Sequence, residues 1–241
     1  MMLLPMVASA DESGSCGESV TWNFEEATGT LTISGTGPME DYMGCTEGST
    51  WSKENIHPFR EIGPKIKFVT VNEGVSTIGG GIFAFCPNLI SISIPNSVTS
   101  IGDVAFCGCS KLSGITISNN ISYIGARAFS DCSSIESISI PQTLNFIGRN
   151  AFQNCSGLTT LIIPKGIELK SYAFSGCSRL SSLTINEGVI IGPAAFQSCN
   201  GLVSLKIPSG VIMGESAFWN CTGLISVTFD DNLTSIGNYT F

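Results

Sequence analysis

Apolar residues recur along this chain in short runs with a fixed internal order. From residue 66 onward, a Leu or Ile is followed three residues later by Ile, Leu or Val, and two residues after that by another apolar residue. Alternation with period two is typical of a short β-strand that buries one face. Proline, which cannot donate to a ladder and so ends a strand, follows four of these runs, at Pro95, Pro141, Pro164 and Pro208. The pattern predicts about eight short strands, the first of which begins at Ile66.

The same units carry a phenylalanine column. It consists of Phe83, Phe106, Phe129, Phe152, Phe174, Phe196, Phe218 and Phe241, at steps of 22 or 23 residues. A unit this short cannot bury its own apolar side, so the units must stack to share a continuous core. This period and strand pattern are those of a leucine-rich repeat. We therefore predict an α/β solenoid with a parallel strand face and, from the Ile-Gly segment before each Phe, short helical or 3-10 turns on the convex side.

The chain divides into three segments. Residues 1–10 are apolar and end in small residues, as a secretory signal does at its cleavage site, although an apolar start without structure is the alternative. Residues 11–62 do not repeat; the alternating stretches "SVTWNF" and "TLTIS" predict a β-hairpin, which would cap the first rung. Residues 63–241 form the repeats and stop inside one, so we expect a C-terminal end without a cap.

A cysteine column accompanies the phenylalanines, three residues after each Phe from Phe83 to Phe218. Its members are Cys86, Cys109, Cys132, Cys155, Cys177, Cys199 and Cys221. We expect mostly unpaired buried thiols, because cysteine is among the most buried residue types and seven residues cannot all pair among themselves. The wide spacing without histidine partners argues against a metal site. In the non-repeating segment we expect Cys16 and Cys45 to form a disulfide.

Two stretches of the sequence carry a resemblance to a known family. "CGESVTWNFEEATGTLTISGTGPMEDY" is similar to the cap motif of BspA-like leucine-rich repeat proteins, and "IPNSVTSIGDVAFCGCSKL" is similar to their repeat. The resemblance covers residues 16–241. It implies a secreted or cell-surface protein of bacteria or parasitic protists, of a kind associated with adhesion to host proteins and cells. It departs from the pattern at Leu169-Lys170, where the usual Ile-Gly is missing.

Composition and charge exclude several other functions. The formal net charge is −8, and residues 1–74 hold 11 of the 19 acidic residues but 4 of the 11 basic ones, so no basic patch exists for nucleic acid. No apolar stretch is long enough to span a membrane. The single histidine, His57, has no partner arrangement of a nucleophilic triad. We expect no enzyme activity, no metal and no cofactor.

The candidate ligand face is the side of each strand opposite the core. Small hydroxyl side chains dominate it, with Phe68 and Ile162 as apolar exceptions. Its candidate residues are Phe68, Thr70, Ser91, Ser93, Thr116, Ser137, Ser139, Thr160, Ile162, Ser182, Thr184, Ser204, Lys206, Ser226 and Thr228. Hydroxyls both donate and accept hydrogen bonds, so protein or glycan ligands both fit. The alternative is a solvated sheet face without a ligand.

We therefore predict a non-enzymatic, adhesin-like module that is secreted or held at the cell surface and binds host or extracellular-matrix proteins or glycans. Any affinity from one copy should be modest, because the face offers no Trp, Tyr or Arg anchor and would gain from several copies acting together. The alternative hypothesis is a structural spacer that presents another domain and has no ligand of its own.

Overall fold

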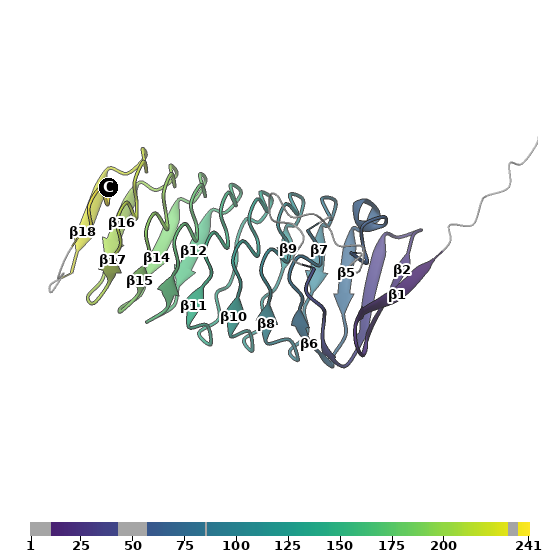
Figure 1. The fold of residues 1–241 in the computed structure, drawn as a ribbon. Helices are drawn as coiled ribbons and strands as arrows, with labels where there is room; N and C mark the ends of the chain where they lie inside the picture. The colour runs from purple at the N-terminus through teal and green to yellow at the C-terminus, as the bar shows by residue number, and fades with distance from the viewer. Residues whose placement is uncertain (1–10, 43–56, 85, 231–235) are drawn as a thin grey trace, which may run out of the picture.

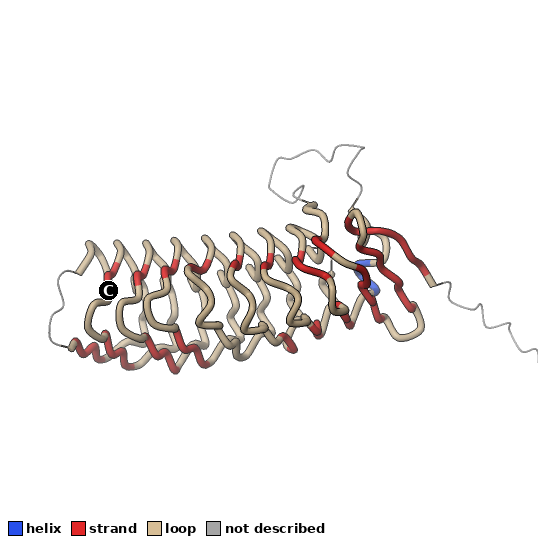
Figure 2. The backbone as a smooth tube through the Cα atoms, turned by 90° about the horizontal axis from the view of Figure 1, so that it is seen from below, coloured by secondary structure: helices blue, strands red, loops and turns tan. Residues whose placement is uncertain are grey.

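The chain forms an extended parallel β-solenoid whose turns follow one another in sequence order (Figure 1). The computed structural model describes residues 11–42, 57–84, 86–230 and 236–241. Most turns place one strand on one side and a second short strand on another, so that two rows of strands run along the molecule (Figure 2). The predicted signal remnant, residues 1–10, lies outside the described residues.

The first row of strands contains the predicted repeat strands, and we call its solvent side the strand face. Its members are β5 (Phe68–Val71), β7 (Ser91–Ser93), β9 (Gly114–Ile115), β12 (Thr160–Ile163), β14 (Ser182–Ile185), β16 (Ser204–Ile207) and β18 (Ser226–Phe229). Seven of the eight predicted strands are present. The fourth, around Ile138, is reduced to a single parallel bridge between Ser137 and Thr160. Gly114 begins the short strand beside it, and a glycine inside a strand weakens pairing.

The N-terminal cap continues the same sheet. Its strands β1 (Glu12–Gly17), β2 (Val20–Glu25) and β3 (Thr30–Gly35) pair antiparallel, and β3 then pairs parallel with β5. The β2–β3 pair is the hairpin that the alternating stretches predicted. The cap therefore shares one sheet with the first repeats and buries its inward side chains, such as Phe24 and Leu31, in the same core.

The second row of strands was missed by the sequence analysis. It is an eight-stranded parallel sheet made of β4 (Gly37–Pro38), β6 (Val75–Ile78), β8 (Ser100–Ile101), β10 (Tyr123–Ile124), β11 (Phe146–Ile147), β13 (Glu168–Leu169), β15 (Ile190–Ile191) and β17 (Ile212–Met213). Most of these strands coincide with the residues just before the Gly of each Ile-Gly segment. The sequence pattern predicted a helical turn in that region, because a strand of two residues is too short to show alternation of apolar and polar residues.

The predicted helical turns are wrong, and with them the α/β class. Among the described residues the one helix is the 3-10 helix η1 (Gly63–Lys65), which precedes the first repeat strand. Around each Phe, some backbone N–H groups instead donate to carbonyls of the next turn and others donate to carbonyls of their own turn. The N–H of Phe106 bonds to Ala128 O of the next turn (2.7 Å), whereas the N–H of Cys109 bonds back to Phe106 O (3.1 Å).

Left-handed residues are the physical reason why no helix forms there. The residue two before the Phe has positive φ in successive turns, as at Val104 (60°), Arg127 (54°) and Tyr172 (61°). A left-handed residue cannot continue a right-handed helix. For a β-branched residue such as Val104 this conformation is uncommon, so the hydrogen bonds to the neighbouring turn must hold it.

The phenylalanine column forms the centre of the core. Adjacent rings from Phe83 to Phe218 lie 5.0–5.5 Å apart between centroids with interplanar angles of 3–12°. Phe59 of the cap adds a ring at one end, 5.7 Å from Phe83, and Phe241 adds one at the other, 5.8 Å from Phe218. Aromatic pairs at such distances contribute about 0.5–1.5 kcal/mol each beyond their buried area. The ring contacts of the phenylalanine column therefore make one continuous core from the cap through the repeats.

Glycine after the second-row strand permits close stacking of the turns. A Cβ on Gly148 would lie 2.5 Å from the carbonyl carbon of Gly125 in the previous turn. Lys170 stands at the equivalent place one turn later. Its side chain makes an ion pair with Glu168 (Nζ–Oε1 2.6 Å) and lies over the Phe146 ring at 5.6 Å.

Candidate functional site

The structure places the candidate residues of the strand face in two rows on its solvent side. One row pairs Thr160 with Ser182 and the other pairs Ile162 with Thr184. Ser91 is partly buried, and the other candidates are exposed: Phe68, Thr70, Ser93, Thr116, Ser137, Ser139, Thr160, Ile162, Ser182, Thr184, Ser204, Lys206, Ser226 and Thr228. Inward neighbours such as Leu161 are buried. The period-two pattern of the sequence gave these orientations correctly.

The strand face is longer than the sequence predicted, because it extends over the cap. Thr30 pairs with Phe68 and Thr32 pairs with Thr70. Asn23 continues the second row one strand further, opposite Thr32. The signal was present in "TLTIS", whose outward positions are hydroxyls as in the repeats, but the assignment of residues 11–62 to a separate cap hid it.

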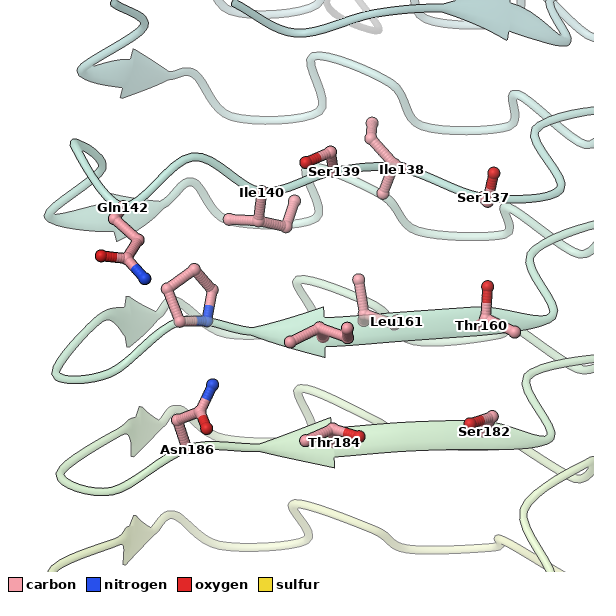
Figure 3. A pocket seen from close by; sticks show the side chains of 12 residues that line it. Ser137, Ile138, Ser139, Ile140, Gln142, Thr160, Leu161, Ser182, Thr184 and Asn186 are labelled. Atoms are coloured by element: carbon pink, nitrogen blue, oxygen red, sulfur yellow. The ribbon is translucent and has the colours of Figure 1, made fainter. Parts of the chain in front are cut away.

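A hollow of about 620 Å³ lies on the strand face where the fourth predicted strand is missing. Three successive turns contribute its lining: Ser137, Ile138, Ser139, Ile140 and Gln142; Thr160, Leu161, Ile162 and Pro164; Ser182, Thr184 and Asn186. In Figure 3 the side chains of Gln142 and Asn186 extend toward the middle turn from opposite sides. Gln142, Pro164 and Asn186 were not among the predicted site residues, since they follow the strands.

The hydroxyls of this hollow differ from most hydroxyls at the edges of the turns. At the edges, side chains such as Ser134 (2.6 Å to Ser110 O) and Thr143 (2.6 Å to Ile121 O) bond to carbonyl groups of the previous turn. Within the described residues, no side-chain hydrogen bond is formed by the hollow's Ser137, Ser139, Thr160, Ser182, Thr184 or Gln142. The edge hydroxyls hold the turns together, whereas those of the hollow keep their hydrogen-bonding capacity for solvent or a ligand.

Charged groups lie outside the hollow. Lys165 and Glu187, which follow two of its lining residues in sequence, form an ion pair with each other (3.0 Å). Lys206 on the strand face forms an ion pair with Asp230 (3.0 Å). Lys206 lies in β16, two turns beyond Thr160 in β12. The hollow is therefore an uncharged, hydroxyl-rich surface with one strongly exposed apolar side chain, Ile162, of which 63% is accessible.

The seven column cysteines are all buried and none is in a disulfide. Six of them donate from Sγ to the carbonyl oxygen of the Phe in the preceding turn, as Cys155 does to Phe129 O (3.2 Å). The same carbonyl accepts the N–H of the Cys in its own turn, as Phe129 O does from Cys132 (3.3 Å). Each of these six Phe carbonyls therefore accepts two hydrogen bonds, one of them from the next turn.

Burial also sets the protonation state of these thiols. Desolvation raises the pKa of Cys86, Cys155 and Cys177, and raises that of Cys221 to about 12. A thiol with a raised pKa stays protonated at neutral pH, which it must do in order to donate a hydrogen bond. It is also unreactive, because the thiolate is the nucleophile.

The cysteines outside the column lie in different surroundings. Cys16 is buried, and burial raises the pKa of its thiol to about 12, with the Glu40 carboxylate adding to the effect. Its predicted partner Cys45 lies outside the described residues, so the pairing stays a prediction. Cys107 is partly exposed.

His57 has a structural environment. It is buried, and its Nδ1 accepts the N–H of Phe59 (3.0 Å). Its Nε2 lies 3.0 Å from Gly81 O and so carries the proton. Desolvation lowers the His57 pKa, so the neutral ring is the form that joins the cap to the first turn.

Among the described residues, neither a metal-binding cluster nor a membrane-spanning helix is present. The part of the chain that the structure describes contains no group of three or more His, Cys, Asp or Glu side chains able to hold a metal ion. None of the helices within it is long and apolar enough to cross a membrane.

The outward row of the second sheet was not predicted as a surface. It carries larger apolar side chains than the strand face, among them Tyr123, Ile190 and Ile212, which are 37–51% exposed. Tyr123 meets Phe146 edge to face at 5.5 Å and donates from its hydroxyl to Asp103 (3.1 Å). Tyr123 therefore has a ring contact and a hydrogen bond within the protein, unlike the hydroxyl side chains of the hollow.

Comparison with protein-family models identifies the family to which the repeats belong. A model described as the BspA type leucine rich repeat region matches residues 58–177 and 147–241. The chain belongs to the BspA-type leucine-rich repeat family. The resemblance read from the sequence motifs is confirmed, and the matched residues cover the repeats together with the phenylalanine and cysteine columns. The matched family is one of repeat scaffolds.

Solved structures similar to this BspA-type chain are leucine-rich repeat proteins. One from T. pallidum shares 20% identity with a TM-score of 0.51, over 90% of this chain and 82% of the other. A leucine-rich cell surface protein from Faecalibacterium prausnitzii shares 15% identity (TM-score 0.39, 95% and 97% covered). The pneumococcal vaccine antigen PcpA shares 17% (TM-score 0.46, 72% and 55% covered). At 20% identity the likeness to the T. pallidum protein shows the fold alone. No curated protein matches the chain.

Proposed function

We propose that this chain is a non-enzymatic interaction module, secreted or held at the cell surface, whose strand face binds an extracellular protein or glycan. The observation that carries the proposal is the set of exposed hydroxyls on that face that form no side-chain hydrogen bond with the rest of the described protein. Hydroxyls that stabilised the turns would bond to neighbouring carbonyls, as those at the edges do. Membership of a leucine-rich repeat family supports the role of an interaction scaffold. Solenoids commonly bind their partners through side chains of several neighbouring strands.

The alternative is a spacer that presents another domain. The same repeats would give a rigid rod through the stacked core, with no need for a ligand. Few features of the strand face distinguish the two, because a solvated sheet also favours Ser and Thr. Binding measurements must therefore decide between them.

The test is binding of the full chain, clustered on beads, to immobilised extracellular-matrix proteins and mucin-type glycans. Clustering matters because a face without aromatic anchors gives modest affinity per copy. A variant with Lys at Ser137, Ser139, Thr160 and Thr184 should lose saturable binding. A control with Lys at four exposed residues away from the strand face, Ser110, Asn145, Ser178 and Thr222, should keep it. No saturable binding by the clustered protein would favour the spacer.

A further inference from the structure

We propose that the hollow on the strand face binds an uncharged saccharide. The inference rests on the proposed function and narrows it to one place on the strand face and one class of ligand. Three properties of the lining lead to it: its lack of charge, its unused hydrogen-bonding groups, and its size and position on the sheet.

The lack of charge argues against an ionic ligand. None of the twelve residues that line the hollow is ionisable. Three ionisable residues are directly next to lining residues in the sequence. Lys165 and Glu187 neutralise each other in an ion pair, and the exposed Glu136, next to Ser137, adds negative charge that would repel an anion. A sulfate or carboxylate entering the hollow would lose hydration without meeting a counter-charge, and this carries a large free-energy cost. A neutral ligand has no such cost.

The polar groups of the hollow match a polyhydroxylated ligand. Five hydroxyls and the Gln142 amide line it without hydrogen bonds to the rest of the described protein. Each hydroxyl can donate one hydrogen bond and accept two, and the amide does both. Saccharide hydroxyls have the same double character. Exposed Ile162 lies among these groups and offers an apolar contact for the C–H face of a sugar ring.

The size and position of the hollow favour a saccharide over a peptide. Its volume of about 620 Å³ falls within the roughly 300–1,000 Å³ of small-molecule sites. Extended peptides bind by adding a strand to a sheet edge, whereas this hollow lies on a sheet face between neighbouring turns (Figure 3). Protein partners rely on Trp, Tyr and Arg anchors, and the hollow has none.

The experiment uses the full chain clustered on beads and three sets of immobilised probes. The first set is neutral oligosaccharides ending in galactose, mannose or N-acetylglucosamine. The second is the same oligosaccharides carrying sulfate or sialic acid, and the third is extracellular-matrix proteins. Three variants are compared with the unaltered chain: Ile162→Lys and Thr184→Lys inside the hollow, and Thr222→Lys as the matched control. Thr222 is exposed, has the same residue type as Thr184, and lies away from the strand face and outside the hollow.

We expect binding to at least one neutral oligosaccharide that does not weaken at high salt, because no ion pair contributes to it. Each hollow variant should weaken this binding by about tenfold or more, equivalent to about 1.4 kcal/mol, while Thr222→Lys leaves it unchanged. Thermal unfolding of each variant must match that of the unaltered chain.

Two results would overturn the inference and leave the proposed function intact. One is binding restricted to proteins or to the charged oligosaccharides. The other is neutral-saccharide binding that Thr222→Lys reduces as much as the hollow variants do, or that the hollow variants do not change. Absence of binding to all three sets would overturn the proposed function and the inference together.

Discussion

The strand face and the phenylalanine column belong to the same turns but follow different physical rules. Along the column the turns from Phe83 to Phe196 repeat the same arrangement: a stacked ring, a buried thiol and a carbonyl that accepts two hydrogen bonds. Along one row of the strand face the side chain changes from Thr116 to Ile162 to Lys206. Close packing forbids variation in the core, whereas a solvated position tolerates it. A site for a ligand can therefore develop on the strand face of a single group of turns.

The sharpest way to break this comparison is to remove a ring from the middle of the column. Phe152→Ala should lower the free energy of unfolding by about 3–5 kcal/mol, since it leaves a cavity and ends two ring contacts. Chemical denaturation checks the value. A loss below about 1 kcal/mol would show that the turns do not depend on a continuous column.

Close stacking of the turns gives the next largest effect. Gly148→Ala should cost about 1–3 kcal/mol, because its Cβ would press on the backbone of Gly125. Gly108→Ala is a control for the backbone conformation: Gly108 has positive φ (76°) but open space around a Cβ. Denaturation midpoints should rank Gly148→Ala as the more destabilising. The reverse order would mean that backbone conformation outweighs close approach.

The cysteine column tests whether a buried thiol contributes a bond between turns. Cys155→Ala should cost about 1–2 kcal/mol, because it removes the donor to Phe129 O and leaves a small void. Cys107→Ala, at a partly exposed position, should change stability by less than about 0.5 kcal/mol. Equal effects of the two substitutions in thermal unfolding would contradict the role of the bond.

His57 should make the junction of cap and repeats sensitive to pH. Burial lowers the His57 pKa in the folded state below its ordinary value of 6.5. Between the folded-state pKa and 6.5, the unfolded chain therefore binds more protons than the folded chain. The stabilising contribution is therefore complete above about pH 6.5 and declines as the pH falls below it. His57→Gln, which can still accept from Phe59 N–H and donate to Gly81 O, should flatten unfolding free energy measured across that range. An unchanged pH slope would assign the effect to other groups.

The strand face should give the smallest effect on stability. Ser93→Lys and Thr184→Lys should each change the unfolding free energy by less than about 0.5 kcal/mol, because both positions are exposed. Denaturation of the two variants beside the unaltered chain checks this. A loss comparable to that of Cys155→Ala would mean that the face also contributes to the fold.

Much of the fold and part of the candidate site could be read from the sequence, because the residues involved repeat. The columns through Phe152 and Cys155, and the outward direction of Thr160 and Ile162, follow from periodicity alone. The second sheet and the conformation around each Phe do not, since two-residue strands and left-handed residues such as Val104 leave no pattern that differs from a helical turn. The assignment of helices failed for this reason.

What the sequence determined by itself is the repeat, its family, the members of the core columns and the solvent side of each strand, all of which depend on local period. The tertiary structure decided how turns meet. It showed that the cap shares a sheet with the repeats, that the fourth strand is missing, and that a hollow opens beside Ile162. It also separated the hydroxyls that hold turns together from those that stay unbonded. These features depend on contacts between residues 22 or more positions apart, and such contacts are fixed only when the turns stack.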